Sequence, residues 1–312
     1  MSSQITAFVF NKIRIDAPLP FELANKCWLS KATADQRKHI KEHLEKLTFT
    51  ADPYLRYEYD PKPCEDGNGE IMVHLPEDQW RYYVVSSPAD GYTNTILHRL
   101  AAISEVPLDL EALTLLEPYC NWGHTPAKVM RYLVAPESPQ PIVVTSEMLD
   151  DLRMLIGLVE AADDTSDGGL DLSDAAKALS MFDASNLLIH HQDAQCLALF
   201  SIIEMLLTHK PDAKDPGDSI TRQIRNKMPL INRRFHRPID ITKTFAAKPD
   251  EVWSLLYEFR SAIAHGGEPD FEKSLNALGS YEKALNFLIC IVKALIRHSL
   301  REPELMRDLK AV

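Results

Sequence analysis

The chain has few cysteines, no long uninterrupted apolar run and no excess of positive charge. Its five cysteines among 312 residues are an odd, dispersed set, which argues against a disulfide scaffold and favours a reducing, cytoplasmic setting. The longest apolar run, 284–296, contains Asn286 and Lys293 and is shorter than the roughly 20 residues that span a bilayer. The first 16 residues lack the charged start and long apolar block of a secretory signal. We therefore predict a cytoplasmic protein with no membrane partner.

Negative charge dominates the chain but is unevenly distributed. The formal net charge is −11, which argues against a surface covered everywhere by nucleic acid. Residues 222–243 contain seven basic residues and one acidic residue, 7 − 1 = +6, so the remainder carries −11 − 6 = −17. This segment can bind RNA phosphates, with Phe235 and His236 stacking on a base, or it can be a solvated connector. The arginines that would contact RNA are Arg222, Arg225, Arg233, Arg234 and Arg237.

The hydrophobic pattern divides the chain into a mixed first part and a helical second part. Strands are predicted at 7–15, 70–74 and 81–86 and helices at 34–47 and 92–103. A proline-rich stretch at 136–141 is a plausible linker. Apolar residues at helical spacing then predict helices at 147–162, 174–181, 191–208, 250–264 and 271–301, with Ser146 and Ser173 as N-caps of the first two. The prediction is an α+β domain over residues 1–140 followed by an all-α domain over residues 141–312.

The segment 253–267, WSLLYEFRSAIAHGG, combines an apolar helix face with two groups suited to phosphate chemistry. Arg260 can stabilise the added negative charge of a pentacoordinate phosphorus, and His265 can transfer protons near neutral pH. His265 falls in the last turn, before two glycines that can adopt the left-handed C-cap conformation. We expect both side chains to face one shared anion. The apolar face is predicted to comprise Leu255, Leu256, Phe259 and Ile263.

This segment resembles the C-terminal signature of the HEPN superfamily, in particular its ApeA-like branch. The family motif is an arginine, four to six residues and a histidine, which Arg260 and His265 match. The upstream segment LALFSIIEMLL, 197–207, places Glu204 where this branch usually has an acidic residue. The likeness covers about 185–300 and leaves the first 140 residues unexplained.

The resemblance implies a metal-independent endoribonuclease that needs no cofactor and acts as a homodimer through its helical domain. In such proteins the RNA 2′-hydroxyl attacks the neighbouring phosphate in a cleft formed by two protomers. His265 would be the acid/base, Arg260 would stabilise the phosphate, and Glu204 would orient Arg260. Ser261 stands where many active members have Asn, Asp or His, so a catalytically inactive dimer that binds RNA or a protein is the alternative. The family context suggests bacterial defence or a toxin-like system, with the first domain selecting the substrate or sensing a protein or phage-derived trigger.

Two further sequence patterns have a spacing similar to that of metal-binding sites. Residues 163–174 approximate an EF-hand calcium loop, but Thr165 is a poor third ligand and Asp174 is shorter than the glutamate expected last. A polar loop between helices explains this segment more simply. His39 and His43 are four residues apart on a predicted helix, yet no third ligand accompanies them. We predict no bound metal.

Overall fold

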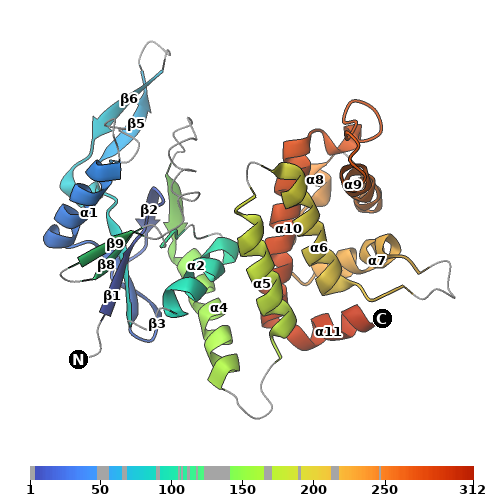
Figure 1. The fold of residues 1–312 in the computed structure, drawn as a ribbon, viewed down its shortest axis with the longest axis horizontal. Coiled ribbons are helices and arrows are strands. Elements are labelled where there is room, and N and C mark those ends of the chain that lie inside the picture. The colour runs from blue at the N-terminus through green and yellow to red at the C-terminus, as the bar shows by residue number, and fades with distance from the viewer. Residues whose placement is uncertain are drawn as a thin grey trace. The chain divides into compact units, whose positions relative to one another are not determined.

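The computed structural model divides the chain into two compact units, Met1–Gly157 and Leu158–Val312. The first unit is rich in strands and the second is helical, as the sequence predicts (Figure 1). The division falls later than the predicted boundary at residue 140, because a strand and the first part of a helix beyond that point belong to the first unit. The structure describes residues 4–47, 56–64, 69–88, 92–104, 106, 108–110, 113–116, 119–122, 141–164, 171–188, 191–211, 218–245 and 247–312.

The first unit is built on a six-stranded sheet in which every neighbouring pair is antiparallel. Its strand order is β3-β4-β7-β1-β8-β9, so the N-terminal strand lies inside the sheet. The strands are β1 (Gln4–Phe8), β3 (Phe21–Ala24), β4 (Cys27–Lys31), β7 (Tyr83–Pro88), β8 (Leu113–Leu116) and β9 (Tyr119–Trp122).

Two small sheets complete the strand content of this unit. Strand β2 (Ile13–Asp16) pairs in parallel with β10 (Ile142–Thr145), and β5 (Tyr59–Pro63) forms an antiparallel hairpin with β6 (Glu70–His74). The predicted continuous strand at 7–15 is wrong, because the chain leaves β1 after Phe8 and turns before β2. The Asn11 side chain fixes this turn by accepting a hydrogen bond from the Asp109 N–H at 2.5 Å.

The helices α1 (Ala34–Leu47) and α2 (Tyr92–Ser104) lie where the periodicity predicts them. A reciprocal capping box starts α1: the Thr33 N–H donates to the Gln36 side chain at 2.9 Å, and the Gln36 N–H donates to the Thr33 hydroxyl at 3.3 Å. Ile40 of α1 is buried with Phe8 of β1 in one apolar cluster. Each such side chain contributes about 1.5–3 kcal/mol by leaving water, which holds α1 to the sheet.

The second unit is a helical bundle in which α5, α6 and α10 run side by side (Figure 1). A short 3-10 turn, η2 (Glu77–Gln79), precedes β7 in the first unit, and η3 (Asn276–Leu278) precedes α10 in the second. The helices from the boundary onward are α4 (Ser146–Asp164), α5 (Ser173–Ser185), α6 (Gln192–Leu207), α7 (Ile220–Asn232), α8 (Ile241–Thr244), α9 (Pro249–Ala264), α10 (Tyr281–Arg301) and α11 (Pro303–Ala311).

Several helix boundaries in this half of the chain differ from the prediction. The helix expected over 271–301 begins only at Tyr281, because Gly279 adopts a φ of 79° and Ser280 then caps α10 through the Lys283 N–H at 3.2 Å. The two predicted serine caps are wrong. Thr145 accepts the Met148 N–H at 3.4 Å, and Asp171 accepts the N–H of the first residue of α5 at 3.0 Å.

None of the helices among the described residues combines the length and apolarity needed to cross a bilayer. Of the predicted linker at 136–141, residues 136–140 lie outside the described residues. Of the cysteines that the structure describes with their side chains, Cys27, Cys64, Cys196 and Cys290 are all free thiols.

Candidate functional site

Helix α9 carries the Arg260–His265 segment and is anchored firmly in the second unit. It starts with a proline at its first position and two acidic residues in its first turn, both favourable at a helix N-terminus. Phe259 is fully buried, and its ring lies 5.4 Å from that of Phe271 and 5.0 Å from that of Tyr281. The predicted apolar face is correct except for Leu255, which is only half-buried. The buried residues of α9 are Val252, Trp253, Leu256, Phe259 and Ile263.

The guanidinium of Arg260 forms an ion pair with Glu204 of α6, as predicted. Arg260 Nη2 lies 3.6 Å from Glu204 Oε1, and the two side chains are 38% and 19% exposed. Arg260 Nε is buried and has no hydrogen-bond partner among the described residues. A guanidinium offers five N–H donors, and within the described part of the chain this one has a single, rather long contact with a carboxylate. The exposed part of the guanidinium therefore retains donors with which it can bind an anion.

Tyr257 is a third member of this cluster, to which the sequence analysis assigned no role. Its hydroxyl donates to Glu204 Oε1 at 3.4 Å, the same oxygen that faces Arg260. Its ring contacts that of Phe200 on α6 at 5.4 Å, edge to face. Burial, followed by the charge of Glu204, raises the pKa of Tyr257, so the hydroxyl remains a donor at neutral pH. The only signal in the sequence is its position three residues before Arg260, on the same side of the helix.

His265 is the C-cap of α9, and the following glycines form a Schellman motif. Gly266 has a φ of 72°; its N–H donates to Ile263 O at 3.0 Å, and the Gly267 N–H donates to Ala262 O at 2.8 Å. The predicted left-handed cap is thus confirmed. The His265 side chain is exposed and forms no hydrogen bond or ion pair with any residue in the described part of the chain.

Arg260 and His265 leave α9 in different directions within one chain. A separation of five residues turns a helix by about 140° beyond one full turn and advances it by about 7.5 Å. Arg260 accordingly faces α6, while His265 lies on the exposed side that also carries Ser261. The two side chains make no contact with each other among the described residues, and their convergence on one anion stays a prediction.

The left-handed cap can be tested at two adjacent glycines. Gly266→Ala is expected to cost about 1 kcal/mol and to lower the melting temperature by about 2–4 °C, because a Cβ is disfavoured at positive φ. Gly267→Ala is the matched control: its φ is not positive, and an added Cβ would meet Ala262 O at 3.4 Å, an ordinary contact. Thermal melts of both variants test this prediction. Equal melting temperatures would contradict the assignment of a left-handed cap to Gly266.

The basic segment forms α7, with arginines along its exposed side. Arg222, Arg225 and Arg233 are exposed, and their spacing places them on one side of the helix; we call these three residues the arginine stripe. The Arg225 and Arg233 side chains have no ion pair within the ranges described. The opposite side of α7 is buried through Gln223, Ile224, Lys227, Met228 and Ile231.

The remaining residues of the basic segment are less suited to RNA binding than the sequence suggests. Arg234 pairs with Glu302 at 2.6 Å, and Phe235 is only 5% exposed, so the predicted stacking of Phe235 on a base is wrong. His236 and Arg237 are exposed beyond the end of α7. Lys227 is buried, and its Nζ donates to Leu207 O at 2.8 Å, where α6 ends. Burial lowers the pKa of Lys227, which Asp218 partly counteracts.

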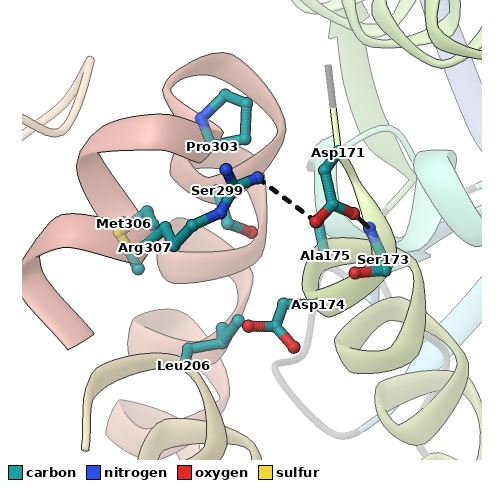
Figure 2. A pocket seen from close by; sticks show the side chains of 9 residues that line it. All are labelled: Asp171, Ser173, Asp174, Ala175, Leu206, Ser299, Pro303, Met306 and Arg307. Carbon is teal, nitrogen blue, oxygen red and sulfur yellow. Dashed lines mark hydrogen bonds and ion pairs between the residues drawn. The ribbon is translucent and has the colours of Figure 1, made fainter. Parts of the chain in front are cut away.

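The loop that resembles an EF-hand has two of its carboxylates engaged by the C-terminal helix. They line a small pocket between the start of α5 and α11 (Figure 2). Asp171 Oδ2 lies 3.2 Å from Arg307 Nη2, and Asp174 Oδ2 lies 2.8 Å from Lys310 Nζ. These pairs serve to dock α11, since each carboxylate faces a cation. The loop residues 165–170 lie outside the described residues.

The histidine pair on α1 shows no arrangement for a metal. His43 Nδ1 lies 2.9 Å from the carbonyl oxygen of His39, one turn earlier in the same helix. His39 Nδ1 lies 3.9 Å from the carboxylate of Glu42. Over the described residues, no three His, Cys, Asp or Glu side chains are grouped so that they could hold a metal ion.

No protein-family model, no curated protein and no solved structure matches the chain. The resemblance to the HEPN superfamily therefore stays a prediction carried by the residues themselves. The geometry adds two features to it, namely the Arg260–Glu204 pair and the exposed His265 at a glycine-capped helix end.

Proposed function

We propose that the chain is a metal-independent endoribonuclease of the HEPN type. The observation that carries the proposal is the state of Arg260 on α9, the helix that ends at the exposed His265. Its partly exposed guanidinium pairs with Glu204 of α6, and its Nε has no hydrogen-bond partner among the described residues. A fixed cation with free donors suits a phosphodiester, and an imidazole that has no partner in the described ranges suits proton transfer.

In the proposed reaction the RNA supplies its own nucleophile. The 2′-oxygen forms a bond to the adjacent phosphorus while the bond from phosphorus to the 5′-oxygen breaks. The products are a 2′,3′-cyclic phosphate and a 5′-hydroxyl, and the proton of the 2′-hydroxyl is balanced by protonation of the leaving 5′-oxygen. Arg260 neutralises the developing charge on the phosphorane, and His265 transfers the protons. The sequence of steps requires neither a metal nor a cofactor.

A homodimer is part of the proposal, because helical spacing places the two groups on different sides of one α9. The side of α9 that lies between Arg260 and His265 exposes Ser261 and Ala264, two small residues that permit close approach of a second helix. Two copies of α9 meeting on this side would combine an arginine and a histidine from different chains in one cleft. We assign substrate selection or trigger sensing to the first unit, in bacterial defence or a toxin-like system, with a protein or phage-derived trigger.

A second function, an inactive RNA-binding dimer, is favoured by two specific observations. Ser261 replaces the longer polar residue found beside the arginine in many active relatives of the proposed family. Arg260 and His265 also diverge on the helix, whereas the arginine stripe on α7 needs no catalytic geometry to bind phosphates. This alternative predicts binding without cleavage.

The deciding experiment incubates the purified full-length protein with total RNA or tRNA in the presence of EDTA. We expect fragments that end in 2′,3′-cyclic phosphate and 5′-hydroxyl groups, identified by end-specific labelling, and a dimer in sedimentation analysis. RNA that stays intact while binding the protein in a filter assay would replace the nuclease with the binding module. A monomer that cleaves RNA would overturn the composite site.

A further inference from the structure

We propose that Tyr257 is a positioning residue of the ribonuclease, acting through Glu204 to orient the Arg260 guanidinium. The inference rests on the proposed function and adds to it a residue outside the Arg260–His265 motif. It starts from one carboxylate oxygen, Glu204 Oε1, which both the Tyr257 hydroxyl and Arg260 Nη2 approach.

The two contacts are coupled because they share an acceptor. The Tyr257 hydroxyl lies 3.4 Å from Oε1 and Arg260 Nη2 lies 3.6 Å from it. The first distance is long for a hydrogen bond and the second is long for an ion pair. Catalytic hydrogen bonds are often long in the unliganded protein and tighten once substrate is bound. A phosphate that draws the guanidinium outward would weaken its pair with Glu204, and the tyrosine would then keep the carboxylate hydrogen-bonded and in place.

The tyrosine itself is well fixed. Its ring lies edge to face against Phe200, 5.4 Å away on the same helix as Glu204. Tyr257 lies three residues before Arg260, so both side chains project from α9 toward α6. Burial and the neighbouring carboxylate keep the phenol protonated, which leaves it as a donor whenever Glu204 is ionised. Tyr257 therefore limits the directions that Glu204 can take, and through Glu204 those of Arg260.

Removing only the hydroxyl separates positioning from packing. Tyr257→Phe keeps the ring contact with Phe200, and Tyr281→Phe is a matched control. The Tyr281 hydroxyl also donates to a carboxylate of α6, Asp193 Oδ1 at 2.7 Å, but this carboxylate is not the one that pairs with Arg260. Both variants lose one hydroxyl-to-carboxylate hydrogen bond in the same unit. Thermal melts establish that both fold.

The experiment measures kcat and KM for RNA cleavage in Tyr281→Phe and in the four proteins that carry either Tyr or Phe at 257 and either Glu or Gln at 204. We expect Tyr257→Phe to lower kcat about 10-fold with KM within about 2-fold, since the hydrogen bond matters most when charge develops. Tyr257→Phe should have little further effect in Glu204→Gln, because the tyrosine acts through that carboxylate. Tyr281→Phe should match the wild type.

The outcomes distinguish this inference from the proposed function. A wild-type protein that cleaves RNA together with a Tyr257→Phe variant that cleaves at the same rate would overturn the inference alone. So would an equal loss in the presence and absence of the Glu204 carboxylate, or an equal loss in Tyr281→Phe. A wild-type protein that cleaves no RNA would overturn the proposed function and this inference with it.

Discussion

His265→Ala is expected to lower the rate of RNA cleavage by about 10²–10⁴-fold, the range for losing a general acid or base. The measurement is single-turnover cleavage of a defined RNA in EDTA, with protein in excess. The substitution leaves the helix end intact, because the cap of α9 is built from the backbone groups of residues 261–267. RNA affinity should change little, since the arginines supply the fixed positive charge that binds phosphates.

Because His265 is exposed, its substitution tests the imidazole without disturbing the fold. The imidazole has no partner among the described residues, so its removal leaves no buried group unsatisfied. His236→Ala is the matched control, because His236 is an exposed histidine in the same unit, beyond the end of α7. If His265→Ala and His236→Ala cleave as fast as the wild type, the imidazole takes no part in the reaction. In that case Arg260 and the arginine stripe would describe a binding surface only.

The sequence predicts the helices whose apolar residues repeat on one side, and it fails where other groups supply the structure. Helix α9 was predicted within one residue, because four regularly spaced apolar residues coincide with a proline start and a double-glycine end. Helix α7 was not predicted, since its buried side includes Gln223 and Lys227 and its middle contains Pro229. Their burial depends on partners elsewhere in the chain: Gln223 bonds His209 and Asp218, and Lys227 bonds the last carbonyl of α6.

The predicted helix at 271–301 shows the opposite error, because the sequence predicts a helix where residues 271–280 form none that continues into α10. Phe271, Leu275 and Leu278 are spaced as on a helix, and the last two are buried. The chain forms turns and the short η3 there, because Asp270 accepts the N–H groups of the two residues at 272 and 273 and Gly279 takes a positive φ. Apolar spacing alone does not distinguish one long helix from a series of tight turns that bury the same side chains.

In the candidate site, too, features set by neighbouring residues could be predicted from local sequence patterns, whereas contacts between distant residues could not. The glycine cap after His265 is a local feature, and it was predicted correctly. The proximity of Glu204 to Arg260 came from the family resemblance and agrees with the structure. The contact of Tyr257 with the same carboxylate joins residues 53 positions apart, which no local pattern encodes. The divergence of Arg260 and His265, by contrast, follows from helical geometry alone.

Charge reversal in the arginine stripe is expected to produce the second large effect, on binding. Arg225→Glu combined with Arg233→Glu should weaken RNA affinity about 100-fold at physiological salt, because each change removes a phosphate contact and adds repulsion. The two residues are exposed and have no ion pair in the described part of the chain, so the reversal breaks no internal contact with that part. Filter binding or fluorescence anisotropy with a labelled single-stranded RNA measures the change.

The salt dependence separates a local contact from a general effect of net charge. Loss of two phosphate contacts should reduce the slope of log affinity against log salt by about 1 to 2. Lys177→Glu combined with Lys248→Glu is the matched control: both lysines are exposed in the second unit and do not belong to the arginine stripe, and the net charge changes by the same amount. If the control weakens binding as much as the stripe variant, the acidic body governs RNA affinity and the stripe is a solvated connector. An unchanged slope in the stripe variant would lead to the same conclusion, because a cation that contacts phosphate releases counterions when it binds.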